Sequence, residues 1–572
     1  MMILWLQLVF ALLYWSNTNA SSATNSIQPH DYHFFRSDNE PRPALHDDGF
    51  VDPTHNFVTR NFISATLGDY MVLQRDKSAV IWGYSQPGAR VYVSLFRDQT
   101  VNENASILPL PPSQRLLLAQ LVTNVDDDGL WRINLPNQPA SKIEHIIDVT
   151  AATGETGRLE HVLFGDVYIC GGQSNMEFSF PGQVNSTLYV QEAITKYPHM
   201  RVMTIGCYTQ SETPLPDLQK IESPWSLPTE DSMRADGPFG RFSAVCWFFG
   251  KEISKALDDK VPLGLINNNW GGSPIENWMD NGAYYNAMIR PYMVGPMALT
   301  GFTWYQGEAN TLDQASADKY ATDFPTMIQT WRHGFEIPDA YFGFVQLSTF
   351  CHDNPVGLAQ FRQAQMSALE LPGKIGYATF ADHGAGCNIH PPDKTICGER
   401  LGRSALALQY GKPILWRSPT YANATTAGLT IYGNGTAAVH VVPSVVIEFR
   451  DVSYAGLYIL ENPYNNRLDP SLFNCTGHPE GTCAWSAVLL NNGQGWVNAT
   501  LNIRDRNKVV MTASKTSLSS LSHDGGDTDV SQQILATSYG WGAVPMMQLY
   551  DAGTNLPVLA WNEKVDTRFL TG

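Results

Sequence analysis

The stretch Val167–Met176, VYICGGQSNM, constrains the fold more than any other part of the chain. Its first four residues are apolar, aromatic or β-branched, which is typical of a buried strand. Gly171 and Gly172 then end the strand, because glycine permits a tight bend at little steric cost. Ser174 follows this turn. Since α/β enzymes place a nucleophile at the C-terminal end of a parallel strand, we predict that Ser174 is catalytic. The alternative is a turn serine that caps the next helix.

Three further stretches favour the catalytic role of Ser174. They are Asn269–Trp278 (NWGGSPIENW), Trp304–Asn310 (WYQGEAN) and Asn388–Pro391 (NIHP). Together with GQSNM, and in this order, they resemble the motif blocks of the SGNH hydrolases. Their residues are most similar to the motifs of the sialate O-acetylesterases. LGDYMVLQRD and IWGYSQPGA, nearer the N-terminus, also look like that family. The resemblance covers nearly the whole mature chain and is weakest over about 412–535.

The resemblance implies a serine nucleophile and a histidine base. His390 can take the proton of Ser174 and return it to the leaving alcohol, because the pKa of histidine is ordinarily about 6.5. Many SGNH enzymes carry an acid three residues before the histidine, but here that residue is Cys387. Asp382, Asp393 or a backbone carbonyl could instead orient the imidazole. We predict a Ser–His dyad, with Asp382 as the reserve acid; a structural salt bridge is the alternative for either aspartate.

An ester hydrolase also needs donors for the oxyanion that forms during attack. The resemblance implies the backbone N–H of Ser174, the backbone N–H of Gly272 and the side-chain amide of Asn310. Gly271 could replace Gly272 as a donor, and a plain turn is the alternative for both glycines.

Polar and aromatic residues flank these blocks. Gln173, Gln306 and Glu308 are predicted to bind substrate, and holding the loops together is the alternative. Trp278 and Trp304 could stack on a sugar ring, but core packing is the better expectation for aromatic residues near strands.

We expect no metal and no cofactor. The chain has no C-x-x-C pair, no H-E-x-x-H, no Walker sequence and no G-x-G-x-x-G after a strand. A serine esterase needs neither. The formal net charge of −17 argues against a nucleic-acid partner or an anionic membrane surface.

The N-terminus predicts entry into the secretory pathway. Residues 3–14 form an apolar run that is too short to span a bilayer and fits a signal peptide, with cleavage after Ala20. A single-pass anchor is the alternative. Six N-x-S/T sequons indicate a glycoprotein: Asn104, Asn185, Asn423, Asn434, Asn474 and Asn498. We therefore expect a secreted or lysosomal protein.

Eight cysteines in an oxidising compartment permit several disulfides. The first candidate pair is Cys475 with Cys483. Cys387 and Cys397 flank His390 and could staple that loop. Cys170 and Cys246 lie in apolar runs and are expected to be packed, reduced thiols.

The pattern of strands and helices predicts an α/β protein of 572 residues with several domains. The expected parts are a signal peptide (1–20), an irregular segment (21–60), a β-sandwich-like domain (61–157), a catalytic domain (158–412) and a C-terminal β-rich domain (413–572). The catalytic domain should be a flavodoxin-like parallel sheet with helices on both faces, as the SGNH resemblance implies.

The resulting functional prediction is a serine esterase. It would remove O-acetyl groups from sialic acids, with 9-O-acetyl esters expected, through an acetyl-enzyme. The partner would be an O-acetylated sialic acid or sialoglycan, and the oligomeric state stays open. Two alternatives are the same chemistry on another acetylated carbohydrate, such as xylan, and a non-catalytic carbohydrate-binding relative.

Overall fold

The computed structural model describes residues 60–98, 115–206, 209–234, 237–351, 354, 356–432, 440–460, 483–491, 495–514 and 533–565. The predicted signal peptide, and all but the last residue of the irregular segment 21–60, lie outside these ranges.

A parallel sheet forms the centre of the catalytic region. Its order is β13 (Ile375–Thr379), β12 (Tyr341–Gln346), β11 (Gly301–Tyr305), β7 (Thr156–Gly172), β10 (Leu263–Asn269), β8 (Met200–Ile205) and β9 (Ile221–Ser226). All pairings are parallel except that of β8 with the edge strand β9. The predicted parallel sheet is therefore present. In a flavodoxin-like sheet, however, the second strand lies beside the first. Here the second strand, β8, lies one position further from β7. The later strand β10 occupies the position between them.

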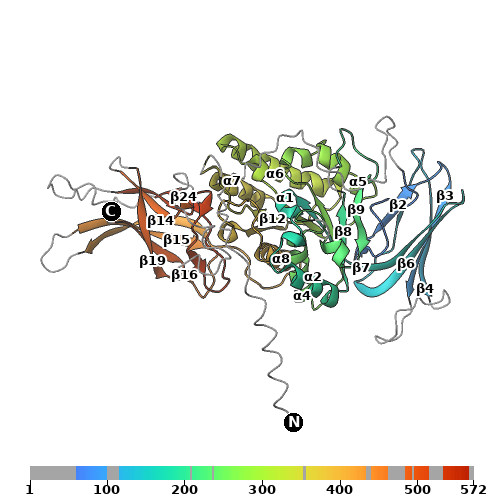
Figure 1. The fold of residues 1–572 in the computed structure, drawn as a ribbon, viewed down its shortest axis with the longest axis horizontal. Coiled ribbons are helices and arrows are strands. Elements are labelled where there is room, and N and C mark those ends of the chain that lie inside the picture. The colour runs from blue at the N-terminus through green and yellow to red at the C-terminus, as the bar shows by residue number, and fades with distance from the viewer. Residues whose placement is uncertain are drawn as a thin grey trace, which may run out of the picture. The chain divides into compact units, whose positions relative to one another are not determined.

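Helices cover both faces of this sheet, as predicted. Figure 1 shows α6 (Gln314–Gly334) and α7 (Gly357–Gln365) on one side and α4 (Ala244–Ala256) and α8 (Thr395–Leu408) on the other. The residues of β10, β11, β12 and β13 are all buried, which is typical of strands covered on both faces. Local chemistry sets the helix starts: for example, the Ser243 side chain accepts a hydrogen bond from the backbone N–H of Cys246.

Strand β7 joins the N-terminal β region to the catalytic sheet. Its first half pairs antiparallel with β6 (Ser141–Ala151), and its second half pairs parallel with β10 and β11. Strands β3 (Arg90–Asp98) and β4 (Arg115–Asn124) continue the sheet beyond β6. The predicted domain boundary at 157/158 thus falls inside a single strand.

The C-terminal region forms its own antiparallel sheet. The order is β14 (Thr420–Tyr432), β15 (His440–Arg450), β20 (Lys508–Ala513), β19 (Trp496–Asp505), β18 (Ser486–Leu490), β21 (Ile534–Tyr539) and β24 (Trp561–Lys564). A separate hydrophobic cluster that includes Ile447, Val509 and Trp561 packs on this sheet.

The disulfides differ from the prediction. Cys170 and Cys246 form a disulfide between β7 and α4, where reduced thiols were expected. Cys387 pairs with Cys351 and not with Cys397, which is a buried free cysteine on α8. The prediction was wrong because sequence proximity does not show which way a helix turns its side chains. Cys475 lies outside the described residues, so its predicted bridge to Cys483 does too.

Three of the six sequon asparagines are described, and all three are exposed: Asn185, Asn423 and Asn498. Asn104, Asn434 and Asn474 lie outside the described residues. None of the helices in the described part of the chain combines the length and apolar character that a membrane crossing requires.

Candidate active site

Ser174 opens the short helix α1 (Ser174–Glu177) directly after β7. Gly172 has a φ of 144°, and a Cβ added there would lie 2.1 Å from the carbonyl oxygen of Tyr305. The backbone N–H of Gln173 donates to that same oxygen at 2.9 Å. Only glycine allows β7 to end so close to β11. The turn leaves Ser174 partly exposed while the next residues of α1 are buried.

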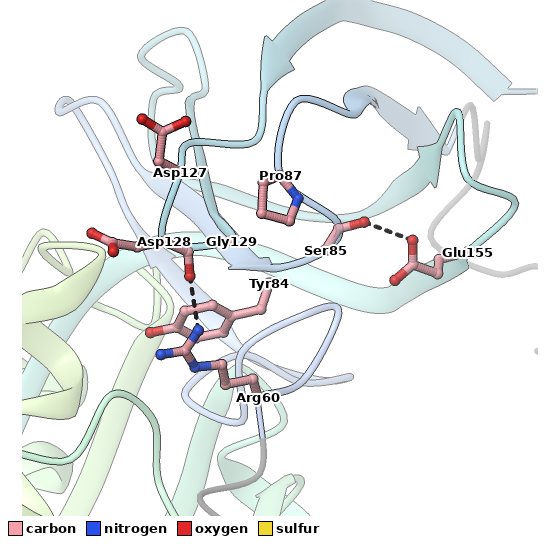
Figure 2. A pocket seen from close by; sticks show the side chains of 8 residues that line it. All are labelled: Arg60, Tyr84, Ser85, Pro87, Asp127, Asp128, Gly129 and Glu155. Atoms are coloured by element: carbon pink, nitrogen blue, oxygen red, sulfur yellow. Dashed lines mark hydrogen bonds between the residues drawn. The ribbon is translucent and has the colours of Figure 1, made fainter.

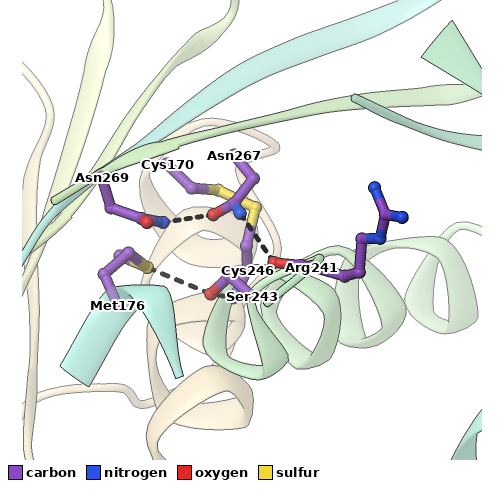
Figure 3. Close-up of a disulfide and its surroundings, with 7 residues drawn as sticks. All are labelled: Cys170, Met176, Arg241, Ser243, Cys246, Asn267 and Asn269. Carbon is purple, nitrogen blue, oxygen red and sulfur yellow. Dashed lines mark hydrogen bonds between the residues drawn. A yellow bond between two sulfur atoms is a disulfide. The ribbon is translucent and has the colours of Figure 1, made fainter. Parts of the chain in front are cut away.

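A disulfide and a buried side chain connect the residues around this turn to α4 (Figure 3). Cys170, near the end of β7, is bonded to Cys246 on α4. Ser243, which caps α4, donates from its hydroxyl to the sulfur of the fully buried Met176 at 3.4 Å. The strand that carries the serine and the helix behind it are therefore joined covalently and by packing.

The structure brings His390 to Ser174, although 216 residues separate them in the sequence. The Nε2 atom of His390 lies 2.8 Å from the Oγ of Ser174, within hydrogen-bond distance. The ring of Phe239 packs edge-on against the imidazole, with centroids 5.1 Å apart. Burial, and then the charge of Lys394, lower the pKa of His390 to about 4. At neutral pH the imidazole is therefore uncharged and its Nε2 can accept the serine proton.

Asp382 does not orient this histidine. Its fully buried carboxylate accepts two hydrogen bonds from the guanidinium of Arg400, at 2.7 and 2.8 Å, and lies 3.4 Å from the hydroxyl of Tyr550. Burial opposes ionisation, but the nearby charges of Arg400 and His383 hold the pKa of Asp382 well below its ordinary value. The alternative stated for this residue, a structural salt bridge, is what the structure contains.

Asp393 has a local structural role as well. Its Oδ1 accepts from the backbone N–H of Thr395 at 3.0 Å, at the start of α8, and from the amide of Gln183 at 3.2 Å. Among the described residues, no side chain or carbonyl is hydrogen-bonded to Nδ1 of His390. The backbone N–H of His390 donates to Oδ1 of Asn388 at 3.0 Å. Ser174 and His390 are in contact, and their role as a catalytic dyad stays a prediction.

The surroundings of the predicted oxyanion donors are as follows. Gly272 is exposed, has a φ of +71°, and has no atom within 4 Å of an added Cβ, so the space beside it is open. A Cβ added at Gly271 would lie 3.4 Å from the Cβ of Ser174, so this glycine borders the nucleophile. The amide nitrogen of Asn310 donates to Oε2 of Glu276 at 3.0 Å. Because an amide has two N–H groups, a second donor remains on Asn310.

Gln173 and Gln306 are buried and hold loops together. Oε1 of Gln173 accepts from the backbone N–H groups of Gly307 and Ala309, both at 3.2 Å. The amide of Gln306 donates to Oδ1 of Asn310 at 2.7 Å and to the carbonyl of Ser273 at 3.1 Å. These contacts match the alternative role, because they leave neither side chain turned toward open space.

Glu308 lies in the helical turn η5 (Glu308–Asn310) and is also buried. Its Oε1 accepts from the amide of Asn175 at 2.5 Å. Burial raises the pKa of Glu308 to about 7. Like the two glutamines, it is buried and bonds to the protein.

Two buried residues beside the pair were not predicted. Asn175 directly follows the nucleophile, and its place in the GQSNM block was a signal for it. Lys394 lies before α8 with no measurable exposure. Nothing in the sequence indicated a buried lysine, because lysine is almost always exposed.

Aromatic residues near the site divide into core and surface. Trp278 and Trp304 are fully buried and pack edge-on with ring centroids 5.7 Å apart, so the expected core packing is confirmed. Trp270 is half-buried and stacks on Tyr284 at 4.2 Å. Trp270 directly precedes Gly271 and Gly272 in the sequence.

A hollow of about 450 Å³ lies elsewhere, in the N-terminal β region (Figure 2). Its wall includes Arg60, whose guanidinium donates to the carbonyl of Asp128 at 2.8 Å and lies over the ring of Tyr84. All its lining residues fall within 60–155, and none belongs to the Ser174 assembly. The hollow therefore has no part in the chemistry of that assembly.

Comparison with known proteins identifies the family of the chain. The model of a family described as carbohydrate esterase, sialic acid-specific acetylesterase matches residues 164–382. The sialate O-acetylesterases of Pongo abelii and Homo sapiens are 32% and 31% identical over 390 residues, which are 60% of this chain and 70% of each relative. A crystal structure of a carbohydrate acetylesterase from Xanthomonas citri is similar with a TM-score of 0.66 and 26% identity, covering 88% of this chain and 99% of that one. The chain belongs to the sialate O-acetylesterase family of carboxylic ester hydrolases.

Proposed function

We propose that the protein removes O-acetyl groups from sialic acids, with 9-O-acetyl esters as the expected substrates, and that Ser174 and His390 perform the reaction. The observation that carries this proposal is the 2.8 Å contact between Nε2 of His390 and Oγ of Ser174, beside an open space lined by glycine. Family membership supports an O-acetylated carbohydrate as the substrate.

The first half of the reaction transfers the acetyl group to the enzyme. Oγ of Ser174 attacks the acetyl carbonyl carbon while Nε2 of His390 takes the hydroxyl proton. The negative charge that forms on the carbonyl oxygen is stabilised by the backbone N–H groups of Ser174 and Gly272 and by the amide of Asn310. The bond to the sugar oxygen then breaks, and His390 gives its proton to that oxygen.

The second half releases acetate. A water molecule attacks the acetyl-serine, and Nε2 of His390 takes one of its protons. The same donors stabilise the second oxyanion. Acetate leaves as the proton returns to Oγ of Ser174, so the free enzyme is restored. No step requires an acid behind the imidazole, because that acid would orient the ring without accepting a proton.

The test is acetate release from p-nitrophenyl acetate, from 9-O-acetyl sialic acid and from acetylated xylan. Ser174→Ala should lower kcat on every cleaved ester by at least ~10³-fold, since no nucleophile remains. Ser186→Ala is the matched control: it lies on α2 (Ser186–Lys196), outside the site, and keeps the sequon of Asn185.

Four outcomes separate the alternatives. A preference for the sialic acid ester, lost in Ser174→Ala, supports the proposal. A preference for xylan keeps the serine chemistry and overturns the sialate assignment. Full activity in Ser174→Ala contradicts the assigned nucleophile, and folded wild type without activity on any ester favours the carbohydrate-binding alternative.

We also propose that the protein enters the secretory pathway and carries N-glycans. The exposure of Asn185, Asn423 and Asn498 supports this. Expression in a eukaryotic cell line should give secreted or lysosomal protein whose mass falls on treatment with an N-glycosidase. Unmodified protein in the cytosol would contradict it.

A further inference from the structure

A buried polar cluster lies directly beside the Ser174–His390 pair. It consists of Asn175 on α1, Glu308 on η5 and Lys394 before α8, which the topology brings together from three separate elements. Asn175 and Lys394 have no measurable exposure. Buried polar groups are costly unless they bond to one another, so three of them in contact demand an explanation.

Asn175 is the centre of this cluster. Its amide nitrogen donates to Oε1 of Glu308 at 2.5 Å and to the carbonyl of Ile389 at 2.8 Å. Its Oδ1 accepts from Nζ of Lys394 at 2.5 Å. The residue that follows the nucleophile is thus bonded to the residue that precedes the base. One side chain connects the two catalytic residues of the proposed mechanism through their sequence neighbours.

Lys394 and Glu308 fix the orientation of that side chain. Nζ of Lys394 donates to Oδ1 of Asn175, while Glu308 and the Ile389 carbonyl accept from its amide nitrogen. These contacts together determine which end of the Asn175 amide points at Ile389. The ammonium also lies 4.7 Å from the centre of the Phe178 ring, with the rings of Tyr305 and Phe380 near it. Burial lowers the pKa of Lys394 to about 7, while the nearby thiol of Cys397 and the carboxyls of Glu308 and Asp393 favour its charge.

We propose that Asn175 is a positioning residue that sets the distance between Ser174 and His390, and that Lys394 and Glu308 hold its amide in the required orientation. This inference rests on the proposed serine mechanism. It accounts for how the imidazole is placed although neither candidate aspartate reaches it. A displacement of about 1 Å at reacting groups can cost ~10²-fold in rate, so such a contact matters for catalysis.

A swapped double variant isolates the contact with the base. In Asn175→Asp with Glu308→Gln, the new carboxylate can accept both from the amide introduced at position 308 and from Lys394, and only the bond to the Ile389 carbonyl is lost. We expect kcat to fall by at least ~10-fold with KM within about threefold, and Asn175→Ala to fall further, by ~10²-fold. Glu308→Gln alone keeps an acceptor for Asn175 but no longer fixes its orientation, so kcat should fall by less than in the double variant.

Asn286→Ala is the matched control. Asn286 is equally buried, and its amide donates to two carbonyls, those of Ser211 and Asn281, at 3.1 and 3.3 Å. It should lose similar stability and keep kcat within about threefold. If the folded double variant keeps wild-type kcat, or if Asn286→Ala loses as much kcat as Asn175→Ala at equal Tm, the positioning role is overturned.

A second readout separates this inference from the proposed substrate. The rate at which a fluorophosphonate labels Ser174, followed by mass spectrometry, reports activation by His390 without any acetyl ester. Fast labelling of wild type and slow labelling of the double variant support the inference even if no acetylated sugar is cleaved. Equal labelling rates, or no labelling of wild type at Ser174, contradict it.

The pH profile tests Lys394. Its positive charge disfavours the imidazolium of His390. Lys394→Met should therefore move the acid limb of kcat/KM upward from about pH 4. An unchanged limb together with unchanged kcat would exclude Lys394 from the positioning unit.

Discussion

The loops that carry Ser174 and His390 are held in different ways. The serine loop is set by backbone: β7 ends in the middle of the sheet, Gly172 passes against Tyr305, and one backbone hydrogen bond closes the turn. The histidine loop contains no strand, and α8 begins only after it, at Thr395. Side chains from elsewhere hold it.

Two such contacts fix the histidine loop. Asn175 donates to the carbonyl of Ile389, and Cys351 forms a disulfide with Cys387 three residues before the base. A backbone-defined turn leaves a signature in a short stretch of sequence. A loop held by distant side chains does not, because its partners lie tens or hundreds of residues away. Four changes test this contrast.

Removal of the base should have the largest effect. In His390→Ala we expect kcat/KM for p-nitrophenyl acetate to fall by about 10³- to 10⁴-fold, because no group remains to take the serine proton. The Tm should change little, since the imidazole is partly exposed and, within the described part of the chain, its side-chain hydrogen bond is the one to Ser174. A loss of less than tenfold would show that another group acts as the base.

Gly172→Ala tests the backbone-defined side. The added Cβ would lie 2.1 Å from the carbonyl oxygen of Tyr305 at a φ that favours glycine, so β7 and β11 must separate. We expect a loss of about 3 kcal/mol or more in the free energy of unfolding, measured by urea denaturation, with kcat falling as well. Gly154→Ala is the control, because it also has a positive φ but nothing within 4 Å of the new Cβ. Equal losses in the two variants would contradict a specific role for the close approach.

The disulfide beside the base tests the side-chain-defined side. Replacing Cys351 and Cys387 by serine opens a loop of 36 residues. The expected cost is about 2–4 kcal/mol in the free energy of unfolding, and kcat should fall more than it does when Cys170 and Cys246 are replaced. Circular dichroism melts and kcat measured on both pairs would decide. A greater loss of kcat on replacing Cys170 and Cys246 would contradict the view that side chains mainly hold the histidine loop.

The smallest effect is the expected pH dependence between pH 7 and 5. Burial, and then Lys394, lower the pKa of His390 to about 4, so the imidazole stays neutral and its own titration should leave kcat/KM nearly constant over this range. Below pH 4 it should fall about tenfold per unit. The contribution of His390 to the free energy of unfolding also decreases toward acid pH. It is fully present above pH 6.5 and is lost as the pH falls toward 4, because the unfolded state binds the proton more readily. A midpoint near 6.5 in the rate profile would contradict the burial of the ring.

The sequence by itself determined the elements whose signals are local. The apolar residues of VYICGGQSNM form the end of β7, which stops at Gly172, as predicted. The turn at Gly172 and the place of Ser174 follow from a few adjacent residues. The family resemblance added His390, Gly272 and Asn310, and the comparisons confirm the family.

Only the tertiary structure decided what joins these parts. It placed β10, and not β8, beside β7. It also paired Cys351 with Cys387 and brought Asp382 into a salt bridge with Arg400. It also buried Lys394 against Asn175. Each of these depends on which surfaces meet after the chain has packed. Hydrogen bonds and disulfides between distant residues leave no periodicity in a single sequence, so no local pattern could have shown them.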